Sequence, residues 1–253
     1  MKKQKVLVVG NWKMNPVTLA EAKMLFTKVK RVGVGLRNVE TVLCPPFVFI
    51  SALSGVAVKL GSQDVFWQNG ERFTGQISPE MLKGLGVSYC LVGHSERRAL
   101  GETDEVVSKK ANAALREGLK VVVCIGERER DSSGAYFDFL KDQLKKSLAG
   151  VPLRFLSDLI IAYEPVWAIG KSFRESMSPA DIRETSIFIR KILSDIYDRA
   201  SIAAVTVIYG AAVEPENVAA VLKEGEVSGV LVGHKSLEAD DFIAILKSAN
   251  LSR

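Results

Sequence analysis

The stretch AYEPVWAIG, residues 162–170, joins a buried β-strand to a loop and places one carboxylate at the junction. The run DLIIAY, residues 158–163, has the length and apolar character of a buried strand. Glu164 follows this run, and Pro165 disfavours an immediate helix because proline lacks an N–H group and restricts the residue before it. The sequence therefore predicts a strand that ends at Glu164 and holds its carboxylate in position to act as a base.

A second stretch, CLVGHSERR at residues 90–98, also runs from an apolar strand into a polar segment. His94 follows the strand, and Ser95 and Glu96 are expected to start a helix. The positive end of the helix dipole disfavours a protonated imidazole. We therefore expect His94 to be neutral and to donate a hydrogen bond.

The stretch VLVVGNWKMNP, residues 6–16, repeats this plan. Asn11 and Lys13 follow its strand, and Pro16 is expected to open a helix because proline suits the first helical turn. An amide and an ammonium group thus join the carboxylate and the imidazole just past the ends of strands.

Short β-branched runs alternate with amphipathic stretches along the chain, at about thirty residues per unit, which is typical of repeated strand–helix pairs. The predicted strands are Val6–Val9, Thr41–Cys44, Ala57–Gly61, Tyr89–Val92, Lys120–Ile125, Leu159–Tyr163, Ala204–Tyr209 and Gly229–Val232. Eight such runs favour a closed (β/α)8 barrel of parallel strands with outer helices, forming one α/β domain over residues 1–253. An open doubly wound sheet is the alternative, but its G-x-G-x-x-G turn is missing after the first strand.

The 253-residue chain is 47% hydrophobic and has a net charge of +5, from 34 basic and 29 acidic residues. The basic residues are scattered, which argues against nucleic-acid binding, and a mildly positive field suits a small anionic substrate. No apolar run is long enough to cross a bilayer, so no membrane partner is expected. The histidines are His94 and His234 alone, and neither a Cys-x-x-Cys pair nor a phosphate-binding P-loop occurs, so we expect no metal and no cofactor.

Cys44, Cys90 and Cys124 lie within apolar strand runs or at their ends. Such positions predict buried, reduced thiols that pack in the core. Reduced thiols are typical of cytosolic proteins, and the apolar run near the start of the chain is too short for a signal peptide. We therefore expect a cytoplasmic protein.

The motifs GNWKMN, GHSERR and AYEPVWAIG, in this order and at this spacing, resemble those of the triosephosphate isomerase family. The resemblance extends from about Val6 to about Leu246. It implies a TIM barrel that interconverts dihydroxyacetone phosphate and D-glyceraldehyde 3-phosphate through an enediolate, in glycolysis and gluconeogenesis. It also implies a homodimer and a cofactor-independent aldose–ketose isomerase.

The resemblance assigns roles to the polar residues at the strand ends. Glu164 matches the family's catalytic base and His94 its neutral electrophile, which is the family's known arrangement. Lys13 and Asn11 match the ammonium and amide groups that stabilise negative charge on the substrate oxygen and phosphate. Glu96 matches an acid that helps to fix Lys13 or the proton in transit.

Further matches concern the lid, the phosphate and the subunit contact. Trp167, Ile169 and Leu231 match the lid and an apolar clamp that removes water from the base, which raises its pKa. The residues that match phosphate-binding positions are Asn11, Lys13, Gly170, Ala212, Gly233 and His234. Thr74 and Gly75 match the tip of a loop that inserts into the partner subunit.

The sequence departs from the family pattern at the phosphate end and in the dimer loop. The lid continues as KSFRESM, residues 171–177, and is longer than usual by about two residues. Ala212 replaces a serine whose hydroxyl latches the closed lid, His234 replaces a glycine, and Gln76 replaces an acid that forms an ion pair between subunits. We expect His234 to border the phosphate, and Lys171, Arg174 or Lys235 to add contacts to it. These changes leave a related phosphosugar epimerase or lyase, or a non-catalytic barrel, as alternatives.

Overall fold

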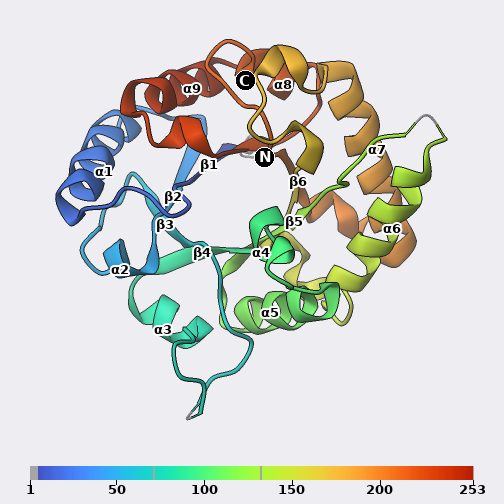
Figure 1. Cartoon of the computed structure of the whole chain (residues 1–253), viewed down its shortest axis with the longest axis horizontal. Coiled ribbons are helices and arrows are strands. Elements are labelled where there is room, and N and C mark those ends of the chain that lie inside the picture. Colours follow the sequence, from blue (N-terminus) through green and yellow to red (C-terminus); the bar gives the residue numbers. More distant parts are fainter. Residues whose placement is uncertain (1–4, 71, 132, 253) are drawn as a thin grey trace.

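The computed structural model describes residues 5–70, 72–131 and 133–252, and in this part of the chain eight parallel strands close into a barrel (Figure 1). The strands are β1 Val6–Asn11, β2 Val39–Cys44, β3 Lys59–Ser62, β4 Val87–Val92, β5 Lys120–Ile125, β6 Leu159–Tyr163, β7 Thr206–Tyr209 and β8 Gly229–Val232. Each strand pairs with the next, and β8 pairs with β1, with Leu7 opposite Gly229. The predicted closed barrel is confirmed, and the predicted bounds of β5, β6 and β8 match those in the structure.

Helices surround the barrel on its outside (Figure 1). The outer helices are α1 Leu19–Gly33, α2 Phe47–Ile50, α3 Pro79–Gly84, α5 Asp104–Arg116, α6 Ala135–Ser147, α7 Pro179–Ile196, α8 Val218–Lys223 and α9 Ala239–Leu251. The short helix α4, Ser95–Ala99, lies inside this ring, at the barrel opening. Short 3-10 helices are η1 Leu153–Asp158, η2 Val166–Ala168, η3 Phe173–Glu175, η4 Ser201–Ala204 and η5 His234–Ser236. The predicted strand at Ala204–Tyr209 begins later than expected, because η4 occupies its first residue.

Capping residues decide where the longer helices begin. Thr18 accepts a hydrogen bond from the N–H of Glu21, whose carboxylate accepts one from the N–H of Thr18, and this capping box starts α1 at Leu19. The prediction that Pro16 opens α1 is therefore wrong. Ser178 and Asp181 form the same box at the start of α7, as the sequence indicates.

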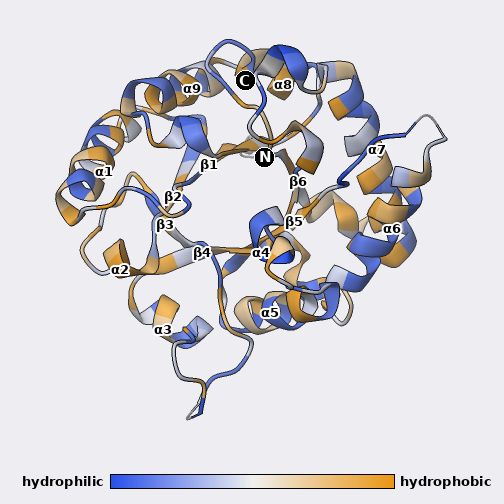
Figure 2. Cartoon of the chain, viewed as in Figure 1, coloured by the Kyte–Doolittle hydropathy of each residue, from blue (hydrophilic) through white to orange (hydrophobic). Residues whose placement is uncertain are grey.

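The apolar residues form two layers. One fills the space between the strands and the surrounding helices, whose apolar faces point inward (Figure 2). The other fills the barrel itself and includes Leu7, Tyr89, Leu91, Val122 and Ile160. A filled interior leaves the site to the strand ends and the loops that follow them.

The three cysteines are buried and free, as predicted. Burial raises the pKa of all three thiols, so they stay protonated. Among the described residues, no helix is both long enough and apolar enough to cross a membrane. The same residues contain no cluster of three or more histidine, cysteine or acidic side chains placed to hold a metal ion.

Candidate active site

The carboxyl ends of the strands surround a cavity of about 350 Å³. Most of the predicted site residues line it, namely Asn11, Lys13, His94, Glu164, Ile169, Gly170, Ala212, Leu231, Gly233 and His234. Glu96 and Trp167 are not among the lining residues, but each contacts one of them, since Glu96 binds Lys13 and Nζ of Lys171 lies over the Trp167 ring. The barrel thus brings together side chains from β1, β4 and β6 that are far apart in sequence.

Glu164 lies at the end of β6 and is almost fully buried, with 2% of its surface exposed. Its N–H donates a hydrogen bond of 2.7 Å to the carbonyl of Ile125, which ties it to β5. Its Oε1 lies 3.6 Å from Nε2 of His94, and Oε2 is buried without a hydrogen-bond partner among the described residues. Burial raises the pKa of Glu164, and the nearby His94 and Lys13 oppose this effect only in part. The carboxylate is therefore poorly solvated and more basic than an exposed one.

Two glycines make room for Glu164. A β-carbon at Gly210, just after β7, would lie 2.8 Å from Cγ of Glu164 and 3.3 Å from its Oε1. A β-carbon at Gly126, just after β5, would lie 1.8 Å from the Glu164 carbonyl oxygen. The positions directly after β5 and β7, the two neighbours of β6, must therefore be glycine for Glu164 to keep its place.

His94 is the N-cap of α4, and its Nδ1 accepts a hydrogen bond of 3.2 Å from the N–H of Glu96. A nitrogen that accepts a hydrogen bond carries no proton, so the neutral ring bears its proton on Nε2. That nitrogen faces Glu164 at the cavity. Gly93 precedes His94 and has a φ of 71°, which suits glycine. The Gly93 N–H donates to the Glu102 carboxylate, and the Gly93 carbonyl accepts from Nε of Arg98.

We expect ¹⁵N NMR of the free protein at pH 8 to show His94 as the Nε2–H tautomer, because the N–H of Glu96 occupies Nδ1. The exposed His234 provides an internal reference, since neither of its nitrogens accepts from a backbone N–H in the described structure. A proton on Nδ1 of His94 would contradict this geometry.

Lys13 has a left-handed backbone conformation, with a φ of 51°. Its N–H donates to the Asn11 side chain at 3.0 Å, and the Gln63 amide donates to its carbonyl at 2.7 Å. Its Nζ lies 2.6 Å from Oε1 of Glu96. These contacts hold an energetically costly backbone and aim the ammonium group at the cavity. Glu96 therefore orients Lys13.

The sequence did not point to Gln63 or to Glu127. Glu127 is buried, with 1% of its surface exposed, and accepts hydrogen bonds from the Tyr163 hydroxyl at 2.9 Å and from Nε1 of Trp167 at 3.0 Å. It thereby fixes the start of the lid, residues 166–177, to β5 and β6. One signal was available, because Glu127 follows the β5 run closely, much as Glu164 follows β6.

The lid has its own hydroxyl contact with the barrel. The Ser176 hydroxyl lies 3.1 Å from the Tyr209 hydroxyl at the end of β7. Ala212 lacks a hydroxyl, as the sequence indicates, but Ser176 of the lid brings one to Tyr209. The lid is thus attached to β7.

The loop after β8 forms part of the cavity wall. His234 begins η5, with 81% of its side chain exposed, and its Nε2 lies 3.3 Å from Glu238. Among the described residues, only Lys13 and Glu226 are non-glycine residues with positive φ, so the turn at His234 does not require glycine. The Ser236 hydroxyl donates to the Gly233 carbonyl at 2.7 Å and stabilises this turn.

Thr74 and Gly75 lie away from the cavity, in the loop between β3 and α3 that projects from the barrel (Figure 1). Both are exposed, and Gly75 has a φ of 85°. Phe73 is 44% exposed and packs on Phe66, with ring centroids 4.6 Å apart.

At the mouth of the (β/α)8 barrel, the N–H group of a neutral imidazole faces a desolvated carboxylate, and an ammonium group lies alongside. This arrangement defines an enzyme that transfers protons next to a carbonyl group. A model of the family "Triosephosphate isomerase" matches residues 6–249, and the chain belongs to this family. It is 40% identical to the triosephosphate isomerase of Alkaliphilus metalliredigens (96% of this chain, 99% of the relative). It is 41% identical to that of Moorella thermoacetica (95% and 97%) and 39% identical to that of Dehalococcoides mccartyi (97% and 97%).

The buried carboxylate has a cost in stability. The pKa of Glu164 is raised on folding, so the protonated carboxyl favours the folded state more than the charged one does. The free energy of unfolding therefore falls as the pH rises through the raised pKa. We expect Glu164→Gln to raise the melting temperature at pH 8, where the wild-type carboxylate is charged, and to have a smaller effect near pH 5. Calorimetry at the two pH values measures this difference, and an equal effect at both would contradict it.

Proposed function

We propose that the chain interconverts dihydroxyacetone phosphate and D-glyceraldehyde 3-phosphate through an enediolate. Glu164 removes the proton from carbon, and Nε2–H of His94 donates a hydrogen bond to the substrate oxygen. The observation that carries this proposal is the 3.6 Å separation of Nε2 of His94 from Oε1 of Glu164 at one cavity. A base and a donor so close together can act on adjacent substrate atoms.

The surrounding residues support this chemistry. The Lys13 ammonium and the Asn11 amide stabilise negative charge that develops on the substrate oxygen. Ile169 and Leu231 line the cavity with apolar surface and exclude water from the base when the lid closes. Backbone N–H groups near Gly170, Ala212 and Gly233 suit the phosphate. The reaction belongs to glycolysis and gluconeogenesis.

A coupled assay with D-glyceraldehyde 3-phosphate tests the proposal on the purified protein. We expect turnover in both directions, and a loss of about a hundredfold or more in kcat for His94→Gln, because the donor to the substrate oxygen is misplaced. Arg116→Gln, at an exposed residue on α5 that does not line the cavity, serves as the control. Activity on another phosphosugar but not on these trioses would favour an epimerase or lyase, and no turnover would favour a non-catalytic barrel.

We also propose that the protein is a homodimer formed through the loop that contains Thr74 and Gly75. Exposed apolar side chains gather on the segments around this loop, which Figure 1 places next to one another, and isolated monomers rarely expose such patches. The exposed fraction is 44% for Phe73, 77% for Val48 and 59% for Met81.

In sedimentation at micromolar concentration, we expect about twice the 27.6 kDa chain mass. Phe73→Asp should shift the protein toward monomer, whereas Leu251→Asp, at an exposed site on α9, should not. A fully active monomer would refute the dimer.

Two further expectations remain proposals. The buried free thiols fit a reducing compartment, and we propose a cytoplasmic location. We propose that residues 1–253 form one domain, of which residues 1–4, 71, 132 and 253 lie outside the described part.

A further inference from the structure

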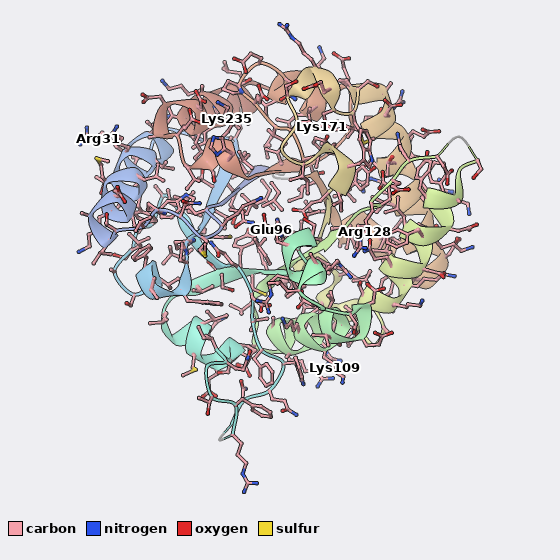
Figure 3. The ribbon with its side chains drawn as sticks, viewed as in Figure 1. Arg31, Glu96, Lys109, Arg128, Lys171 and Lys235 are labelled. Carbon is pink, nitrogen blue, oxygen red and sulfur yellow. The ribbon has the colours of Figure 1, made fainter. Side chains whose placement is uncertain are left out.

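Three positively charged or protonatable side chains from the lid and from the loop after β8 line the cavity. Lys171 from the lid joins His234 and Lys235 from the loop after β8 in lining it. Figure 3 shows Lys171 and Lys235 on the same side of the barrel opening. None of these three side chains has a role in the proton transfers described above.

Two of the three side chains are already engaged by acids. Nζ of Lys235 lies 2.6 Å from Asp241 and 3.6 Å from Glu238. Nε2 of His234 lies 3.3 Å from the same Glu238 carboxylate. Both side chains are therefore held toward the start of α9, and the charge of Lys235 is largely offset.

Lys171 differs from them. It is exposed, follows Gly170, and places Nζ 5.4 Å from the centroid of the Trp167 ring. In the described part of the chain, no carboxylate lies within ion-pair distance of this ammonium group. The pKa of Glu175 is lowered first by the Ser172 hydroxyl, and the charge of Lys171 adds only a minor effect. The ammonium group thus rests on an indole face at the cavity and is available to an anion.

We propose that Lys171 is a phosphate-binding residue that supplies a full positive charge from the lid. The substrate named here rests on the proposed function, whereas binding of the phosphate group itself does not. Backbone N–H groups offer only partial charges, Ala212 has no hydroxyl to donate, and Glu214 adds a carboxylate to the cavity lining. A lysine on a flexible stem can leave the ring and reach a phosphate oxygen, where an ion-assisted hydrogen bond is stronger than a neutral one.

The experiment compares Lys171→Met with Lys109→Met. Lys109 is a matched control because it is also an exposed lysine over a tryptophan, with Nζ 5.8 Å from the Trp67 centroid, but it lies at the outer edge of the molecule on α5 (Figure 3). We expect Lys171→Met to weaken binding of inorganic phosphate about tenfold, measured by calorimetry, and Lys109→Met to change it less than about twofold. Lys171→Arg should retain most of the affinity.

Kinetics then separate phosphate binding from a general effect on the lid. For D-glyceraldehyde 3-phosphate, Lys171→Met should raise KM about tenfold and change kcat by less than about twofold. For glyceraldehyde, which lacks the phosphate, kcat/KM should be unchanged. Equal losses with both substrates, or unchanged phosphate affinity, would overturn the proposal.

The two proposals fail in different ways. A wild-type protein that binds phosphate through Lys171 but does not turn over trioses would refute the proposed function alone. A protein that is active on trioses but binds phosphate equally well with and without Lys171 would refute this inference alone.

Discussion

Replacing Glu164 by aspartate is expected to lower kcat by about a hundredfold while leaving the fold intact, because a shorter side chain withdraws the carboxylate from the substrate carbon by about one methylene. The buried position offers no way to recover that reach. Gly126 lets the Glu164 backbone lie against the end of β5, and the Glu164 N–H donates a hydrogen bond of 2.7 Å to the Ile125 carbonyl. Steady-state kinetics with D-glyceraldehyde 3-phosphate measure the loss, and circular dichroism checks the fold.

The same substitution at Glu129, an exposed residue in the loop after β5, is the matched control and should change kcat by less than about twofold. If Glu164→Asp also retained activity within about a factor of two, Glu164 would not be the base.

Replacing Gly210 by alanine is expected to lower kcat by a similar factor of about a hundred, although Gly210 contributes no side chain to the reaction. The added methyl group would lie 2.8 Å from Cγ of Glu164 and 3.3 Å from Cβ of Leu231, both buried. Because a contact of 2.8 Å is too short for two carbon atoms, the Glu164 side chain must shift toward the cavity and lose its position beside His94. The kinetic measurement is again kcat, and a crystal structure of the variant would show the shifted side chain.

Gly84→Ala is the matched control, because a β-carbon at Gly84 meets no atom within 4 Å. We expect it to leave kcat unchanged and stability equal or slightly higher, since alanine suits a helix better than glycine does. Full activity of Gly210→Ala would mean that the site tolerates the methyl group and that packing there does not position the base.

The fold and the catalytic side chains were largely predictable, because their signals are local. The runs that form β5, β6 and β8 are largely apolar, contain β-branched residues and are followed by glycine or a polar residue, and any chain segment with this pattern favours a buried strand. The positions of Glu164 and His94 just after such runs place them on one face of any closed parallel barrel. Where two local signals compete, prediction is weaker, and α1 begins at the Thr18 cap rather than at Pro16.

What only the tertiary structure decided depends on contacts between residues far apart in sequence. Gln63 reaches the Lys13 carbonyl, Glu127 binds Trp167, and Ser176 meets Tyr209, and each of these pairs forms because barrel closure brings separate loops together. The tertiary structure also decided which lysine at the cavity has an ion-pair partner. Lys235 pairs with Asp241, whereas Lys171 lies over the Trp167 ring, and the sequence does not distinguish the two. By itself the sequence determined which strands form and which reactive groups follow them, since hydrophobic periodicity acts over a few residues. Burial, pairing and the space left for Glu164 were decided by packing across the closed barrel.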